Sequence, residues 1–376
     1  MIVIGILSTA TLAADRTGSG TEDDPYVYTV STAKDLTEAV GAINADDSGN
    51  THYIISLQDN ITYPSGMSFS YNTTTIFGNN HTLSLTGGSD HYITVAGTDD
   101  TKMPGLILGS SDGTDTLTLK GQKTSDCPPF FLVGDNYAGT KYGTLKMYDG
   151  VTITGAVGSN YFGGAVIVGS GGYFEMNGGT IENCGIDGGS VCFGGGVAVI
   201  NGGGFTMNGG SIRDCFLNTG YNFGDDYGNE QFNLLYSNGA GAGVFVANGA
   251  AFTMNGGEIK NNRIEKKTDA LFGSYGVGGG IAVMADFDDY VITARVEITG
   301  GTIEGNHATL GGGGIAVCGM IPDVNIIGSS TPSGGSGGIA PGLFIRGAAE
   351  DPVQIKNNTA DGWADYAVGG GGILLY

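Results

Sequence analysis

The fold of this chain is decided by residues 194–215, which read GGGVAVINGGGFTMNGGSIRDC. Three short runs in this stretch, at 197–199, 205–207 and 211–213, alternate between apolar and smaller or polar side chains, which is the period of a β-strand. Asn-Gly-Gly follows the first and the second run, and Asn-Gly tolerates the left-handed backbone angles of tight turns. The stretch therefore predicts a unit of three short strands joined by two turns.

The same unit recurs along the chain with constant internal spacing. Met-Asn-Gly-Gly starts at Met176, Met207 and Met254, and a related Ile-Thr-Gly-Gly starts at Ile298. A glycine-rich run ending in valine lies ten residues before each methionine, and an isoleucine lies five residues after each of the four starts. One unit alone buries too little apolar surface to offset the entropy lost on ordering it, so the units must stack about 4.8 Å apart.

We therefore predict an all-β fold, a right-handed parallel β-helix over residues 51–376. Hairpins with Asn-Gly turns are the alternative. A meander of hairpins would not return the same motif to the same face each time, which favours the coil.

A column of Asn, Asp and Cys is predicted where each unit bends after its isoleucine. The pairs in this column are Asn183-Cys184, Asp214-Cys215, Asn261-Asn262, Gly305-Asn306 and Asn357-Asn358. Stacked amides hydrogen-bond the coils above and below, so we predict a structural role for these asparagines. Cys184 and Cys215 would have Cα atoms about 4.8 Å apart in adjacent coils, which permits a disulfide. Two buried thiols are the alternative, because side chains that point the same way often miss the required torsion angle.

The N-terminal region is predicted to contain two segments before the coils. Residues 1–14 combine a short apolar run with small residues, which is typical of a signal peptide, although its basic start is missing. A buried first strand is the alternative. Residues 15–50 hold a lead-in segment and a helix over 31–46, which Thr32 and Asp35 begin as a capping box. Its apolar face would cover the open end of the stack and its strand edges.

The C-terminal end begins another unit at 370–373 and stops at Tyr376. We therefore expect the chain to be truncated at this end and to be part of a longer surface protein.

Composition and charge exclude several classes of protein. Glycine makes up 72 of 376 residues without the Gly-X-Y period of collagen. The net charge of −22 repels nucleic acid and anionic membrane surfaces, and it attracts cations such as Ca²⁺. No apolar run after residue 14 reaches the ~18 residues of a transmembrane helix. We predict a secreted or cell-surface protein that does not span the membrane and binds no nucleic acid.

Several motifs resemble a known group of surface proteins. GGAV at 163–166, GGGV at 194–197 and GGGI at 312–315, with IEGNHA at 303–308, resemble the "GGA[ILV]" and "xxNxA" repeats of polymorphic outer-membrane proteins and of adhesin-like proteins from gut bacteria. FGNNHTL at 77–83 is similar to the first-rung motif of the pectate-lyase-like superfold. The resemblance implies a bacterial, adhesin-like parallel β-helix.

A polysaccharide lyase or glycoside hydrolase acting on acidic polysaccharide is the alternative, because this superfold hosts both functions. Such enzymes need grouped carboxylates, or carboxylates with calcium and a basic residue. The chain has Asp-Asp pairs at 99–100, 225–226 and 288–289, but it lacks the Asn-Thr-Asp, His-Gly and Arg-Ile-Lys motifs of polygalacturonase-like hydrolases. We therefore predict a binding scaffold and assign no catalytic residue.

The connections between units supply the candidate ligand site. They run from the third-strand isoleucine to the next unit over 16, 32, 22 and 12 residues, and all fall at one corner of the coil. The longest carries the residues that we predict to bind a carbohydrate or a host- or cell-surface ligand: Tyr221, Phe223, Asp225, Asp226, Tyr227, Glu230 and Tyr236. Loops that pack on themselves and merely cover the stack are the alternative.

A calcium site is predicted in a seven-residue insertion near residues 285–291. Asp286, Asp288 and Asp289 offer the carboxylate oxygens that Ca²⁺ prefers. A solvated acidic turn is the alternative. No other cofactor is predicted.

Overall fold

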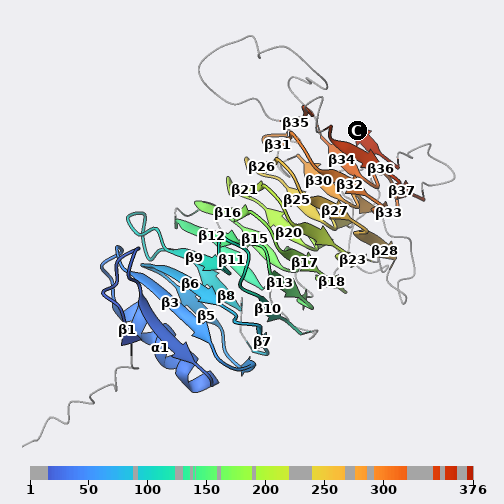
Figure 1. Cartoon of the computed structure of the whole chain (residues 1–376). Coiled ribbons are helices and arrows are strands. Elements are labelled where there is room, and N and C mark those ends of the chain that lie inside the picture. The colour runs from blue at the N-terminus through green and yellow to red at the C-terminus, as the bar shows by residue number, and fades with distance from the viewer. Residues whose placement is uncertain are drawn as a thin grey trace, which may run out of the picture.

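The chain forms a parallel β-helix with one N-terminal helix (Figure 1). The structure, a computed structural model, describes residues 16–87, 92–122, 130–135, 139, 141–158, 162–188, 192–219, 239–266, 276–285, 292–319, 342–347, 352–361 and 371–375. Every pairing between its named strands is parallel except that of β1 with β2. The predicted fold class is confirmed, and the hairpin alternative is wrong.

Three long sheets form the walls of the coil. Sheet A contains β1 Arg16–Thr17, β2 Tyr26–Val30, β3 His52–Leu57, β6 Thr73–Phe77, β9 Gly105–Leu108, β12 Gly143–Met147, β16 Gly172–Met176, β21 Gly204–Met207, β26 Ala251–Met254, β31 Arg295–Ile298 and β35 Gly342–Ile345. Sheet B contains β4 Ile61–Tyr63, β7 His81–Leu85, β10 Leu117–Lys120, β13 Val151–Thr154, β17 Thr180–Glu182, β22 Ser211–Arg213, β27 Glu258–Lys260, β32 Thr302–Glu304 and β36 Gln354–Lys356. Sheet C contains β5 Met67–Phe69, β8 Ile93–Val95, β11 Phe131–Val133, β15 Val166–Val168, β20 Val197–Val199, β25 Val244–Val246, β30 Ile281–Met284, β34 Ile315–Cys318 and β38 Ile373–Leu375.

Two further sheets lie in the connections between sheets B and C, and the sequence did not predict them. Sheet D contains β14 Val157–Gly158, β18 Gly185–Asp187, β23 Phe216–Thr219, β28 Arg263–Lys266, β33 His307–Ala308 and β37 Thr359–Ala360. Sheet E contains β19 Cys192–Phe193, β24 Gly239–Ala240 and β29 Gly276–Val277. Because each sheet is a ladder across successive connections, the connections start and end at the same corner, as predicted.

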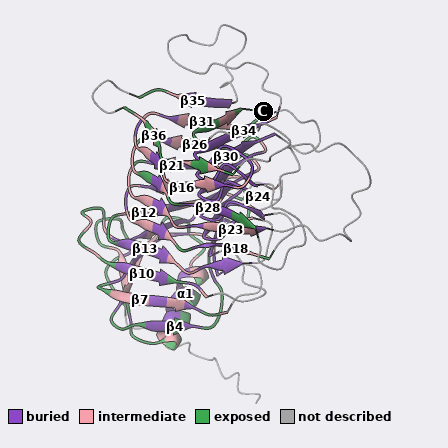
Figure 2. Cartoon of the chain, turned by 90° about the vertical axis from the view of Figure 1, so that its right-hand side faces the viewer, coloured by how far each residue is buried: buried purple, intermediate pink, exposed green. Residues whose placement is uncertain are grey.

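The repeated motifs are in register from coil to coil. Met207 pairs with Met176 and Met254, and all three side chains are buried. Beside them Phe174, Phe205 and Phe252 stack with ring centroids 4.8 Å apart in both pairs. In Figure 2 the buried residues form continuous stripes along the stacked strands. The inward-facing columns therefore make one core that runs from Tyr28 to Leu343.

The column at the bend after sheet B is a hydrogen-bonded ladder. We call Cys184, Cys215, Asn262, Asn306 and Asn358 the bend column. The Asn262 amide accepts from the Cys215 backbone N–H at 3.0 Å and donates to the Asn306 side chain at 3.0 Å. Asn306 is bonded to Asn358 in the same way. The residue before each column member has positive φ: Asn183, Asp214, Asn261, Gly305 and Asn357.

The N-terminal end of the stack is covered by α1, Ala33–Ala45. Its capping box forms between Thr32 and Asp35, as predicted, and Leu36, Ala39, Val40 and Ile43 are buried against the first coils. Figure 1 places α1 at this end, below the first strands of the stack. Within the described residues no helix is long and apolar enough to cross a membrane. The predicted signal peptide at 1–14 lies outside the described residues.

Candidate functional site

The predicted ligand-binding and calcium residues lie outside the described part of the chain. These are Tyr221, Phe223, Asp225, Asp226, Tyr227, Glu230 and Tyr236, together with Asp286, Asp288 and Asp289. Both assignments stay predictions. The strands that lead into the predicted loops are described, however, and they define the surface at this corner.

The predicted disulfide between Cys184 and Cys215 is absent. Both residues are buried thiols in the bend column. Each sulfur lies near backbone carbonyls, Cys184 Sγ 3.3 Å from Glu182 O and Cys215 Sγ 3.5 Å from Arg213 O. The two side chains point the same way along the ladder, so the sulfurs do not face one another. Burial raises the pKa of the Cys215 thiol well above its ordinary value, which keeps it protonated.

The outer face of sheet D is the candidate site. β23 ends at Thr219, directly before residues 220–238, and β28 ends at Lys266, directly before residues 267–275. Two outward columns cross these strands in register. The first contains Phe216, Arg263, His307 and Thr359, and the second contains Asp187, Asn218 and Glu265.

Inward side chains fix the strands that carry this face. Ile186, Leu217 and Ile264 are buried and form one apolar cluster beneath sheet D. The positive-φ residue at the bend turns the chain from sheet B into sheet D. The extended strand that follows then places alternate side chains outward and inward. The outward groups are thus placed by a packed scaffold.

An aromatic ring and a guanidinium lie side by side in the first column. The Arg263 guanidinium carbon is 5.4 Å from the centroid of the Phe216 ring, which is a cation–π contact. The Arg263 Nε is 3.0 Å from Glu265 Oε1, and the two side chains are 40% and 50% exposed. A ligand can therefore reach a planar apolar surface, a donor and an acceptor at neighbouring positions.

His307 lies in the next coil with two polar partners. Its Nδ1 is 2.9 Å from Thr359 Oγ1, and its Nε2 is 3.4 Å from Asp361 Oδ2. Asp361 is 66% exposed and His307 is 29% exposed. This arrangement places a hydroxyl, an imidazole and a carboxylate from two adjacent coils close together.

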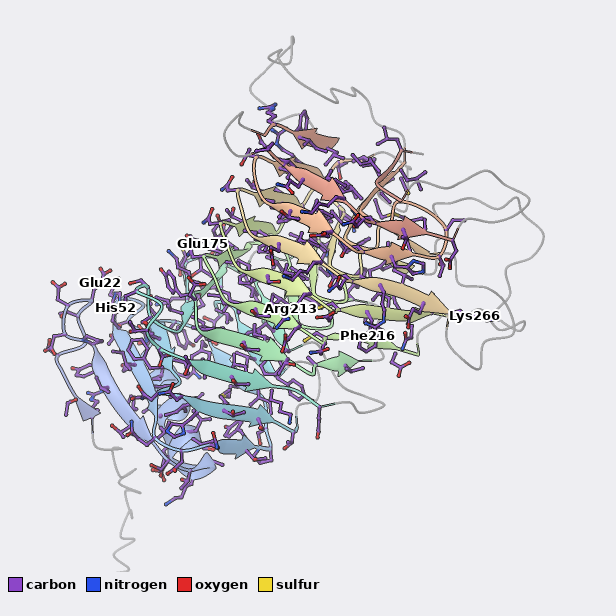
Figure 3. The ribbon with its side chains drawn as sticks, turned by 45° about the vertical axis from the view of Figure 1, so that its right-hand side comes forward. Glu22, His52, Glu175, Arg213, Phe216 and Lys266 are labelled. Atoms are coloured by element: carbon purple, nitrogen blue, oxygen red, sulfur yellow. The ribbon has the colours of Figure 1, made fainter. Side chains whose placement is uncertain are left out.

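Sheet B continues the polar surface on the other side of the bend. Arg213 pairs with Glu182, and Lys260 pairs with Glu258. Figure 3 shows Phe216 between Arg213 and Lys266 at this corner, and Glu175 on sheet A, away from Phe216 and Lys266. The charges at this corner are mixed, whereas the whole chain carries −22.

No group of three or more His, Cys, Asp or Glu side chains that could hold a metal ion occurs among the described residues. The carboxylates of the sheet D face are spread along the columns and each has a polar partner nearby. Asp286, Asp288 and Asp289 lie outside the described residues, between β30 and β31, and the calcium site stays a prediction.

The residues of this face were not assigned from the sequence, although a signal for them was present. In each unit the bend residue is followed by one outward and one small or apolar residue: Gly185-Ile186, Phe216-Leu217, Arg263-Ile264, His307-Ala308 and Thr359-Ala360. That dipeptide is too short to indicate a strand by itself. Read across five units, it predicts a ladder.

The fold and this face define the chain as a parallel β-helix protein with a polar, aromatic-containing surface at one corner of its coils. Comparison with protein-family profiles, with curated proteins and with solved structures gave no match.

Proposed function

We propose that this chain is a secreted or cell-surface scaffold that binds carbohydrate or host- or cell-surface ligands at the sheet D corner. We further propose that it is adhesin-like, bacterial and related to the pectate-lyase-like superfold. The observation that supports binding is the sheet D face, where Phe216, Arg263 and Glu265 lie at the base of the predicted ligand loops. Aromatic rings beside hydrogen-bonding groups are the usual anchors of protein binding surfaces.

A glycan array tests this proposal. The full chain is compared with a variant lacking residues 221–236, with Phe216→Ala/Arg263→Ala, and with Thr118→Ala on the outer face of sheet B as the matched control. Binding should be retained by the control and reduced at least about 10-fold by the double substitution, as for loss of an interface hot spot. Unchanged binding by both corner variants would refute the siting.

A polysaccharide lyase or hydrolase is the second candidate function. The pairing of His307 with Thr359 and Asp361 favours it, because a positioned imidazole is the commonest general acid or base. Incubation with polygalacturonate distinguishes the two functions. A scaffold leaves the polymer length unchanged, whereas an enzyme shortens it and loses that activity in His307→Ala.

A further inference from the structure

A second surface, on sheet A, carries an exposed tyrosine that reaches over the neighbouring coil. Tyr173 lies on the outer face of β16 and is 39% exposed. The other large aromatic side chains among the described residues are buried or half-buried. Most outward positions nearby on this sheet hold threonine, glycine or alanine. This ring is therefore an exception that needs a physical explanation.

The neighbouring coil is shaped to receive the ring. Gly204 pairs with Tyr173 in the sheet, and a Cβ at Gly204 would lie 2.9 Å from Tyr173 Cδ2. The Tyr173 hydroxyl bonds Thr206 Oγ1 at 2.8 Å. The ring thus reaches over the strand of the next coil, with its Cδ2–Cε2 edge against Gly204 and its hydroxyl at Thr206. Any larger residue at 204 would push it away.

The next position in the same column is also small. Ala251 pairs with Gly204 and is exposed. The ring over Gly204 and the small Ala251 side chain together make a strip about two coil spacings long, or roughly 10 Å. Thr206 and Thr253 flank this strip in the adjacent column.

Charged groups border the ring without adding net charge. Lys146 Nζ is 3.1 Å from Glu175 Oε2, and Asn177 Nδ2 donates to Glu175 Oε1 at 3.1 Å. Burial raises the pKa of Glu175, but hydrogen bonds from Asn177 and Lys146 outweigh this and leave it below its ordinary value. The hydrogen bond with Glu175 raises the pKa of Lys146. Both groups are charged at neutral pH and can make strong hydrogen bonds to hydroxyls.

We propose that Tyr173, Lys146 and Glu175 form a binding site for a neutral glycan on the outer face of sheet A. The exposed part of the ring contacts the C–H face of a pyranose, and the ion pair bonds its hydroxyls. The small outward residues Gly204 and Ala251 leave room for a neighbouring sugar unit. The net charge of −22 disfavours polyanionic glycans at this surface.

This site is separate from the sheet D corner, so its occupant does not depend on the function proposed above. Figure 3 shows Glu175 away from Phe216 and Lys266. The two sites can therefore be tested independently with the same protein.

Affinity gel electrophoresis of the full chain in gels that contain xyloglucan, galactomannan or mixed-linkage β-glucan tests the proposal, with polygalacturonate as the anionic comparator. We expect retardation by at least one neutral polymer and none by polygalacturonate. Tyr173→Ala should weaken the retardation roughly 10-fold or more, as for removal of an aromatic anchor. Tyr173→Phe, which keeps the ring, should retain most of it.

Two controls keep the outcome interpretable. Thr118→Ala on sheet B and the deletion of residues 221–236 should leave retardation unchanged, and Tyr173→Ala should keep the wild-type circular dichroism because the side chain is exposed. Absence of retardation by all three neutral polymers, or equal retardation of Tyr173→Ala and wild type, overturns the proposal. Loss of retardation on deleting 221–236 would instead assign binding to the corner and also overturn it.

Discussion

Asparagine and cysteine occupy the same position of the bend in successive coils and make equivalent hydrogen bonds. Asn262 Oδ1 accepts from the backbone N–H of Cys215, which occupies the same position in the preceding coil. Both side chains also donate to a carbonyl of the preceding coil, Asn262 to Ile212 O and Cys215 to Ile181 O. A buried polar column is stable here because every member is satisfied.

Substitution of Asn262 measures how much that hydrogen-bonded ladder contributes to the free energy of unfolding. Asn262→Ala leaves the Cys215 N–H and the Ile212 carbonyl without this partner, and should lower the free energy of unfolding by about 2–5 kcal/mol. Asn262→Cys should cost less than half as much, because a thiol already occupies this position in two coils. Urea denaturation followed by circular dichroism gives both values. If both variants lost the same free energy of unfolding, packing and not hydrogen bonding would explain the asparagine at position 262.

At the scale of the element, the sequence predicted the strands whose motifs are long enough to show alternation. Val197, Phe205 and Ile212 point inward in three different sheets, as their spacing indicates. Sheets D and E were missed because their strands contribute two to four residues and follow a bend or a loop. The candidate site was missed for the same reason, since Arg263 and His307 become neighbours only through the register of sheet D.

Glycine before sheet C is required by the close approach of adjacent coils. A Cβ at Gly243 would lie 2.5 Å from Gly280 O and 3.0 Å from Asn262 Nδ2. The glycine-rich motif and the bend column therefore face one another across the interior. Neither can enlarge without displacing the other.

A pair of glycine-to-alanine substitutions tests this requirement. Gly243→Ala overpacks the interior and should lower the free energy of unfolding by about 1–3 kcal/mol. Gly41→Ala, in α1 with no atom within 4 Å of the added carbon, should raise it by about 0.5–1 kcal/mol. Denaturation curves of the two variants should shift in opposite directions. A stabilised or neutral Gly243→Ala would contradict the proposed contact.

The end of α1 contains a carboxylate whose hydrogen bonds stabilise the fold above acidic pH. Burial raises the pKa of Asp46, but hydrogen bonds from Thr51, Tyr53 and Ser48 outweigh it and lower the pKa from 3.8 to about 2. A group with a depressed folded-state pKa stabilises above its unfolded-state pKa and loses that contribution as pH falls through the folded value. The contribution of Asp46 should therefore be complete at neutral pH and decline between about pH 4 and pH 2.

Asp46→Asn isolates this effect. The variant should be less stable than wild type at neutral pH by about 1–2 kcal/mol, because hydrogen bonds to a charged group are replaced by weaker ones. The difference should shrink as pH approaches 2. Asp47→Asn, at the adjacent exposed position, is the matched control and should follow the wild-type profile. Thermal melts across this pH range measure all three, and a difference that persists at low pH would argue against titration of Asp46.

At the scale of the whole molecule, the stability of every coil depends on one shared apolar core and on the net negative charge of the chain. The core is continuous from Tyr28 to Leu343, so loss of any coil exposes its neighbours. The 37 acidic and 15 basic residues give −22, which opposes the compact state by self-repulsion. Several basic side chains sit next to carboxylates, as Arg295 and Arg346 do with Glu297. Because acidic residues outnumber basic residues, cations in solution must offset the excess negative charge.

Two kinds of cation effect can be separated by experiment. Sodium chloride should raise the melting temperature gradually as it screens the repulsion. If Asp286, Asp288 and Asp289 bind calcium as predicted, Ca²⁺ at equal ionic strength should further raise the free energy of unfolding, by about 2.7 kcal/mol at a hundredfold excess over Kd and logarithmically beyond it. Substitution of all three aspartates by asparagine should remove the calcium increment and leave the sodium effect, because screening depends on total charge and coordination depends on these oxygens. Magnesium is the comparator, since it demands a tighter octahedral geometry. If Ca²⁺ and Mg²⁺ stabilise the protein equally, and if the triple variant keeps that response, screening is the sole cation effect.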